Sequence, residues 1–454
     1  MFRASDAMQP VVEPSFTHAP DHLGSQIDEA RQLHKNGPLL MVAYIGVLLF
    51  LIVYFFRPED FITILRVVPL AKIAGLLTGI ALLGAIFGEG ASLARDSKVL
   101  LIFLGYLCLT IPVSYWRAGS FDVVVNGFSK YVLIAVAAAC AASSISRLRR
   151  LMLVQTLAMF TLAQVSLFFP SRAGRMYGVG QMFSDPNDLA LNLCIVMPLC
   201  IAFLLSARSG VVKVFWTGVA VIMLIAIVFT SSRGGTLTLI AVAPAILIRF
   251  RIKARVTAFL VLLLVCTFTT AAIFAGSSYI ERMKTIADPD SEASSEARHA
   301  MLIASLHMTM RHPIFGVGPG QFEQTSGFWH QTHNSYTQLS SEAGIPALIL
   351  FIYLIRRTFK NLRQCNRECE ENVTLHLVNG VYCGMIAYVV GAFFLSTGFW
   401  LVPYLLMAYA TALSRMSREV GAGANHGLNS SFSCATGSVV SPQRMLNLAS
   451  NIIS

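Results

Sequence analysis

The chain has 454 residues, of which 55% are hydrophobic and only 13% are charged, and its mean hydropathy is +0.66. Soluble globular proteins carry about 25% charged residues. The composition therefore excludes a cytosolic globular enzyme, a disordered chain and a disulfide-stapled secreted module. The net charge of +11 indicates cytoplasmic loops rich in Lys and Arg rather than a nucleic-acid-binding face, so no nucleic-acid partner is expected.

Long apolar runs follow one another along the chain. A helix needs about 20 mainly apolar residues to cross a bilayer, because the hydrocarbon core is about 30 Å thick. The runs predict about twelve transmembrane helices, near 39–56, 67–88, 98–115, 123–145, 151–169, 188–207, 211–230, 235–250, 256–275, 341–356, 376–395 and 398–414. The predicted fold class is an all-α integral membrane protein, a polytopic bundle with one long extracytoplasmic loop at 276–340.

Three segments of the chain are expected. Residues 1–37 are polar and have no apolar segment of the signal-peptide type, so they are predicted to be a cytoplasmic tail. Residues 38–414 form the transmembrane domain. Residues 415–454 are rich in Ser, Asn and Gly and are predicted to be a second cytoplasmic tail.

Basic residues orient the predicted bundle. If the spans simply alternate, the basic clusters all fall on one side, and the positive-inside rule makes that side the cytoplasm. These clusters are Arg147, Arg149 and Arg150; Arg208 and Lys213; Arg249, Arg251, Lys253 and Arg255; and Arg356, Arg357, Lys360, Arg363 and Arg367.

The loop at 276–340 lies on the opposite side and shows no basic bias. A loop of this length inside a compact chain is typical of a functional segment. Its sequence predicts a helix that begins after the Ser and Glu residues of 291–295 and ends at His312 and Pro313. Met301, Ile303, Leu306 and Met310 would give this helix an apolar side. We expect it to lie on the bilayer surface or across the mouth of the bundle.

Charged residues are scarce inside the predicted spans. Asp122, Asp188 and Glu342 all fall at span ends, and Lys72 and Lys130 are the main basic residues drawn into apolar runs. Ion-coupled transporters usually need carboxylates inside the membrane. This pattern disfavours a transporter without excluding one.

Polar residues instead gather at the extracytoplasmic ends of the spans, in three clusters. The first contains Arg175 and the sequence DPND at 185–188. Asp185 or Asn187 can cap the helix that follows, so plain capping is one interpretation of this cluster. Arg175 can either bind an anion or extend to lipid headgroups.

The second cluster is the sequence SRGG at 232–235, between two spans. Its glycines permit a tight turn or close backbone approach, and Arg233 is then presented at the membrane–water boundary. Arg suits phosphate because its planar guanidinium donates two parallel hydrogen bonds.

The third cluster runs from Thr332 to Pro346 and contains His333. A histidine can act as a general base near neutral pH, because its unperturbed pKa is about 6.5. A structural role is the alternative for any single histidine. The loop histidines lack the spacing of a zinc-binding helix, so no metal is expected.

Together these motifs resemble the bacterial family of O-antigen ligases and O-antigen polymerases, which are membrane glycosyltransferases. The resemblance is strongest over 170–355, and the N-terminal third matches mainly in its pattern of spans. It rests on SRGG at 232–235, HPIFGVG at 312–318, HNSY at 333–336 and EAGIP at 342–346, with Arg175 and DPND at 185–188.

The resemblance implies transfer of a glycan from an undecaprenyl-pyrophosphate carrier to an acceptor hydroxyl. The reaction would take place at the periplasmic face of the bacterial inner membrane, and the long loop would be periplasmic. Arg175 and Arg233 would bind the pyrophosphate, and His333 would deprotonate the acceptor, with no metal or other cofactor. Secondary candidates for the site are Asn334, Tyr336, Asp185, Asn187, Arg298 and Glu342.

Several alternatives stay open at this point. The acceptor could be a lipid A core, as in a ligase, or another lipid-linked glycan, as in an O-antigen or exopolysaccharide polymerase. A flippase or other transporter of lipid-linked oligosaccharide is a different class of function. An O-linked protein oligosaccharyltransferase would share the carrier and differ in its acceptor.

Overall fold

The structure is a computed structural model. It describes residues 37–62, 65, 68–168, 176–178, 185–254, 293–328, 330–369 and 371–436, with isolated positions between 258 and 269. Every regular element within these ranges is a helix. The predicted all-α class is therefore confirmed.

Nine helical segments in the described ranges are long and apolar enough to cross a membrane. They comprise α2 (Pro38–Phe56), α4 (Leu70–Gly88), α5 (Arg95–Thr110) with the short η2 (Ile111–Val113), α6 (Arg117–Phe121) continuing through η3 (Asp122–Phe128) and α7 (Ser129–Ala141), α8 (Ile145–Phe168), α9 (Pro186–Ser206), α10 (Gly210–Phe229), α16 (Ser335–Glu368) and α17 (Asn372–Gly391). The other helices are α3 (Pro58–Phe61), α11 (Arg233–Arg249), α14 (Ala293–Arg311), α15 (Phe322–Ser326) and the last helix, α18 (Leu401–Thr436).

Most predicted spans have a matching helix, with shifted ends. The run at 235–250 matches α11, and the run at 398–414 matches α18, which continues well past residue 414. The run at 341–356 is part of the much longer α16, because helix continues through the basic segment that follows the apolar one. The run at 256–275 lies largely outside the described residues, and twelve spans remain a prediction.

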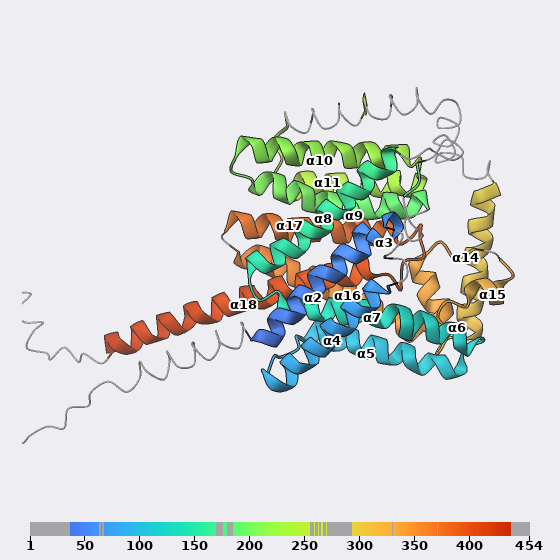
Figure 1. Cartoon of the computed structure of the whole chain (residues 1–454), viewed down its shortest axis with the longest axis horizontal. Coiled ribbons are helices and arrows are strands. Elements are labelled where there is room, and N and C mark those ends of the chain that lie inside the picture. Colours follow the sequence, from blue (N-terminus) through green and yellow to red (C-terminus); the bar gives the residue numbers. More distant parts are fainter. Residues whose placement is uncertain are drawn as a thin grey trace, which may run out of the picture.

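Helix α9 is the centre of one half of the bundle. It packs against α8, α10, α11 and α17, and most of its side chains are buried. The other half is built from α2, α4, α5, α7, α16 and α18. Figure 1 shows α10 and α11 at one edge of the bundle and α4 and α5 at the opposite edge.

The basic residues gather at one end of the bundle, which we call the basic end. Arg147 donates a hydrogen bond to the Ser143 hydroxyl at 2.9 Å, and Arg415 donates to the carbonyl of Ala142 at 3.1 Å. Arg357 forms an ion pair with Asp96 at 2.8 Å. Four connections rich in Lys and Arg thus share one end, as the alternation of spans predicts.

The opposite end holds the beginnings of α9, α11 and α16, and we call it the site end. Helix α14 crosses this end, nearly perpendicular to the long helices (Figure 1). It packs on α16, where the hydroxyls of Thr309 and Ser340 lie 2.9 Å apart. The helix predicted to end near His312 is confirmed, since α14 ends at Arg311. Its N-terminal capping residues lie outside the described ones.

The predicted apolar side of α14 is only partly buried. Met301 is 2% exposed and faces the bundle, whereas Ile303, Leu306 and Met310 are exposed. The periodicity identified a helix correctly but did not show which of its faces meets α16. The small polar residues Ser305 and Thr309 take that contact instead.

Helix α16 is broken by Gly344, which has φ +87° and ψ 171°. The segment at 312–320 runs alongside this break. Val317 and Gly318 donate backbone hydrogen bonds to the carbonyls of Ser341 and Glu342 at 2.9 and 2.8 Å, and Ile345 donates to Pro313 at 2.8 Å. The motifs HPIFGVG and EAGIP are therefore two halves of one backbone-paired unit.

Replacing Gly344 with Ala should destabilise the protein. A Cβ there would lie 1.8 Å from the Ile314 carbonyl oxygen, and the left-handed φ costs about 1–2 kcal/mol for any other residue. We expect the Tm in detergent to fall by about 5 °C or more. Gly105→Ala in α5, where a Cβ would meet nothing within 4 Å, is the matched control and should not lower the Tm. Equal Tm values for the two variants would contradict this account.

Candidate active site

Helix α9 begins at the site end with a side-chain cap. The Asp185 carboxylate accepts a hydrogen bond from the backbone N–H of Asn187 at 2.7 Å, and Pro186 occupies the first helical position. Both features are typical of a helix start. Capping is thus confirmed for Asp185, and it leaves the Asn187 side chain available for contacts with α11.

Helix α11 begins in the same way beside it. The Ser232 hydroxyl accepts a hydrogen bond from the backbone N–H of Gly235 at 3.1 Å and donates one to Asn187 Oδ1 at 2.7 Å. The two glycines allow close packing, because a Cβ on Gly234 would lie 2.9 Å from Phe394 Cβ and one on Gly235 would lie 2.6 Å from Ala190 Cβ. The beginnings of α9 and α11 are therefore held in fixed register.

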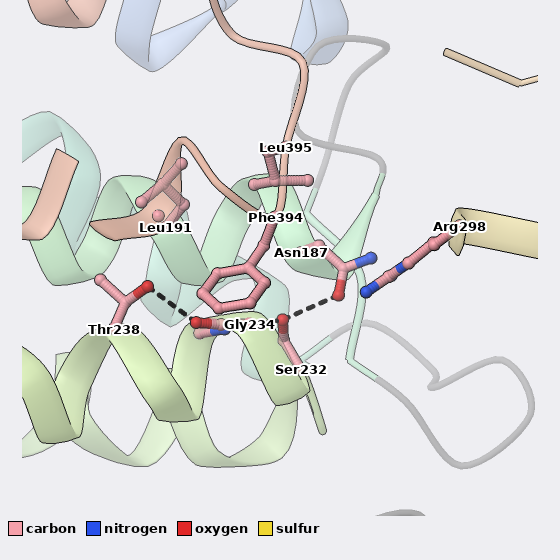
Figure 2. A pocket seen from close by; sticks show the side chains of 10 residues that line it. Asn187, Leu191, Ser232, Gly234, Thr238, Arg298, Phe394 and Leu395 are labelled. Atoms are coloured by element: carbon pink, nitrogen blue, oxygen red, sulfur yellow. Dashed lines mark hydrogen bonds between the residues drawn. The ribbon is translucent and has the colours of Figure 1, made fainter. Parts of the chain in front are cut away.

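A narrow cleft lies where these two helices begin, and its enclosed space has room for about one water molecule. Figure 2 shows Arg298 of α14 reaching toward Asn187, with Ser232 and Gly234 below and Phe394 forming one wall. The cleft is lined by Asn187, Leu191, Ser232, Gly234, Gly235, Thr238, Arg298, Gly391, Phe394 and Leu395. It combines apolar walls with a small polar rim that includes one guanidinium.

His333 stands immediately before α16, held in the left-handed backbone conformation with φ +50°. Asn334 caps α16, because its Oδ1 accepts hydrogen bonds from the backbone N–H groups of Tyr336 and Thr337 at 2.9 and 3.2 Å. Ser335 donates to the carbonyl of Leu395 at 2.6 Å, and Leu395 also lines the cleft. The histidine is therefore tied to the cleft wall through its own backbone neighbours. A left-handed backbone at a non-glycine residue is sparsely populated and is often found at functional sites.

The charge state of His333 is set by its surroundings. Burial, aided by the positive charges of Arg298 and His330, lowers the pKa of the His333 imidazole to about 4, against an opposing effect of the Asp185 carboxylate. His333 is consequently neutral at physiological pH, with a ring nitrogen able to accept a proton.

The other predicted residues have separate positions. Arg233 is the first residue of α11, half-buried and between two residues that line the cleft, although its own side chain is not part of the lining. Arg175 lies outside the described residues. Tyr336 donates from its hydroxyl to the Val389 carbonyl at 2.8 Å and packs on Phe393, so it holds α16 against the end of α17.

Glu342 lies away from the cleft lining. It is 2% exposed, and its carboxylate accepts backbone hydrogen bonds from Gly320 at 2.8 Å and Phe322 at 3.4 Å. Its observed contacts fix the loop that follows α14 to α16. In this position Glu342 supports the placement of α14 and hence of Arg298.

Sequence reasoning missed the wall formed by Gly391, the last residue of α17, and by Phe394 and Leu395, which follow that helix. These residues look like an ordinary span terminus. The only local signal was the small residue Gly391, whose added Cβ would lie 2.1 Å from Leu191 Cδ1.

Comparison with known proteins supports the resemblance over part of the chain. Residues 218–352 match the family model described as O-antigen ligase. The matched segment includes Ser232, Arg233, Arg298, His333 and Glu342, and it begins after the α9 cap. The predicted resemblance to the O-antigen ligase and polymerase family is confirmed there. The comparison with curated proteins finds no match.

Ser232→Ala should weaken the site end. The change removes the α11 cap and the bond to Asn187, and loss of such a cap destabilises proteins by about 0.5–2 kcal/mol. Thermal unfolding in detergent should show a lower Tm. Ser209→Ala is the control, because Ser209 occupies the cap position of α10 without forming a side-chain cap bond. If Ser209→Ala were as destabilising as Ser232→Ala, the capping role would be wrong.

Proposed function

We propose that this protein is a membrane glycosyltransferase that moves a glycan from an undecaprenyl-pyrophosphate carrier to the hydroxyl of an acceptor. The family match supports glycosyl transfer of the O-antigen ligase or polymerase type. The carrier, the roles of individual residues and the absence of a metal are parts of the proposal. So are the inner-membrane location and the periplasmic orientation of the site end, which the basic opposite end supports.

The proposal rests on the way separate elements bring polar side chains together at the site end. Asn187, Ser232 and Arg298 come from three separate elements and line one cleft, and His333 lies two residues before Ser335, which donates to the carbonyl of the cleft residue Leu395 at 2.6 Å. None of these residues is a neighbour of another in sequence. A bundle with no function at this end would not need to bring a guanidinium and a neutral imidazole together.

The cations of this end would bind the carrier pyrophosphate. Arg298 lines the cleft, and Arg233 is the first residue of α11. The sequence resemblance implies that Arg175 would also bind the pyrophosphate. The N-termini of α9 and α11 also point their first N–H groups toward this end, which favours an anion. Donors fixed before the reaction stabilise charge as it develops on the leaving pyrophosphate.

His333 would act as the general base. Its neutral imidazole takes the proton of the acceptor hydroxyl as that oxygen bonds to the anomeric carbon. The bond from the same carbon to the pyrophosphate oxygen breaks, and the carrier leaves with the electron pair. A pKa of about 4 makes a weak base in the free protein. The negative charge of a bound pyrophosphate would raise that pKa toward the working pH, so donor binding would activate the base.

His333→Ala and Arg233→Ala should each abolish measurable transfer, because loss of a general base alone lowers the rate by about 100-fold or more. The measurement is glycan transfer by purified protein from a lipid-linked donor, with membrane insertion checked by yield and monodispersity. His330→Ala is the control for a nearby imidazole, because the exposed His330 ring lies 6.3 Å from that of His333. Near-normal transfer by both test variants would reject the proposed roles.

The pH dependence of kcat/KM should respond in opposite directions to two charge changes. In the unmodified protein the acidic limb should lie near pH 4, because kcat/KM falls as the free His333 becomes protonated. Arg298→Gln removes a cation that disfavours the imidazolium, so the limb should move to higher pH. Asp185→Asn removes an anion that favours the imidazolium, so the acidic limb should move to lower pH. The helix cap is kept in this variant, because Asn is also a good cap residue. Limbs that shift in the same direction would contradict the assignment of this pKa to His333.

A further inference from the structure

The segment that joins α17 to α18, residues 392–400, contacts both the cleft and the start of α16. We call it the α17–α18 connection. Phe394 and Leu395 in this connection line the cleft (Figure 2). Ser396 and Thr397 follow directly, are buried, and lie within hydrogen-bonding distance of residues around the start of α16. Successive residues of one short segment therefore contact both parts of the proposed active site.

The Ser335 hydroxyl is held by three groups of the α17–α18 connection. It donates to the Leu395 carbonyl at 2.6 Å, accepts from the backbone N–H of Thr397 at 2.9 Å, and lies 3.0 Å from the Thr397 hydroxyl. A hydroxyl has one proton to donate and two lone pairs. Because Ser335 uses its proton on Leu395, the Thr397 hydroxyl is the donor in the third contact. The Ser335 hydroxyl is thus fully hydrogen-bonded by the connection.

The Thr332 hydroxyl, on the other side of His333, is held in a similar way. It donates to the Asn334 carbonyl at 2.9 Å and accepts from the Asn334 N–H at 3.4 Å, so it spans His333. The Ser396 hydroxyl lies 2.9 Å from it and is the donor there, because the one proton of Thr332 is already used. The α17–α18 connection therefore supports the left-handed backbone of His333 from both sides.

These hydroxyl contacts are additional to those that attach α16 to α17. Tyr336 already makes that attachment, since its hydroxyl donates to the Val389 carbonyl at 2.8 Å and its ring packs on Phe393 with centroids 4.7 Å apart. Ser396 and Thr397 instead contact residues that flank the histidine. Their arrangement favours a role in placing the imidazole over a role in helix packing alone.

The cleft must widen before a pyrophosphate can enter it. Its enclosed space has room for about one water molecule, and two linked phosphate groups are larger. On one side the beginnings of α9 and α11 are fixed to each other by the 2.7 Å hydrogen bond from Ser232 to Asn187. On the other side Phe394 and Leu395 belong to the α17–α18 connection, which is built of turns. The connection is therefore the wall that yields when the cleft fills.

We propose that Ser396 and Thr397 are positioning residues, and that the α17–α18 connection brings His333 into place for proton transfer when the donor pyrophosphate fills the cleft. The inference rests on the proposed function. As the wall moves, the Leu395 carbonyl moves the Ser335 hydroxyl bonded to it, and the backbone beside it follows. Donor binding would then complete the catalytic arrangement, as in other enzymes that close around a substrate. Without a donor, the imidazole is not placed to act.

The kinetic test is Thr397→Val, which removes the hydroxyl and keeps the shape and the backbone N–H of the residue. We expect kcat to fall by about tenfold, because misplacing a catalytic group slows the chemical step. The donor KM should not rise, since the cleft lining is unchanged. Thr397→Ser keeps the hydroxyl and should retain kcat within about twofold. Thr358→Val is the control and should leave kcat unchanged, because that buried hydroxyl donates to the Leu354 carbonyl of its own helix at 2.8 Å.

Hydrogen exchange tests the same coupling in the purified protein without substrate. Phe394→Ala loosens the cleft wall, and we expect amide exchange to become about threefold faster or more at 333–338 as well as at 392–400. In the S396A/T397V background the same change should speed exchange at 392–400 and have a much smaller effect at 333–338. Thr238→Ala, which alters the cleft lining from α11, is the control and should leave 333–338 unchanged.

The exchange result separates this inference from the proposed function. Absence of transfer by the unmodified protein would reject the proposed function, whereas the exchange pattern decides whether the cleft wall and the histidine segment move together. The inference is overturned if Phe394→Ala leaves exchange at 333–338 unchanged, or if S396A/T397V does not reduce its effect there. A loss of kcat in Thr397→Ser as large as that in Thr397→Val would also overturn it.

Discussion

The need to pair every backbone polar group within a bilayer shapes this protein. Helices meet that need along their length but leave the first N–H groups of each helix without partners. Asp185, Ser232 and Asn334 supply the missing acceptors for α9, α11 and α16, all at the site end. Because a cap fixes the residues on either side of it, the same three caps position Asn187, Arg233 and His333. The residues that cap the beginnings of these helices are therefore next in sequence to residues proposed for the chemistry.

Contacts outside the cleft lining fix the positions of α14 and of the start of α16. The break in α16 at Gly344 pairs with the loop after α14, and the buried Glu342 carboxylate accepts two backbone hydrogen bonds from that loop. The segment after α17 binds Ser335 on one side and lines the cleft on the other. Such support explains how His333 can keep a left-handed backbone, a conformation that persists only when the surrounding structure determines it.

In the proposed reaction the donor carries its phosphates on a lipid. Lipid-linked glycans keep their tails in the bilayer, so their phosphates are confined to the headgroup level and approach from the side. The capped first turn of α9 places Asn187 in the cleft lining at the site end. In the proposed reaction His333, which is neutral at physiological pH, would accept the proton of the acceptor hydroxyl there.

Local patterns in the sequence determined the all-α class, most helix positions, the common side of the basic clusters and the family resemblance. These features depend on hydropathy or on contacts within a turn or two, which adjacent residues encode. Tertiary structure alone decided that Arg298 reaches the cleft, that Phe394 forms its wall, that Glu342 fixes a loop, and that α14 presents Met301 rather than Leu306 to the bundle. Such outcomes depend on how helices far apart in sequence pack, and no local pattern carries that information.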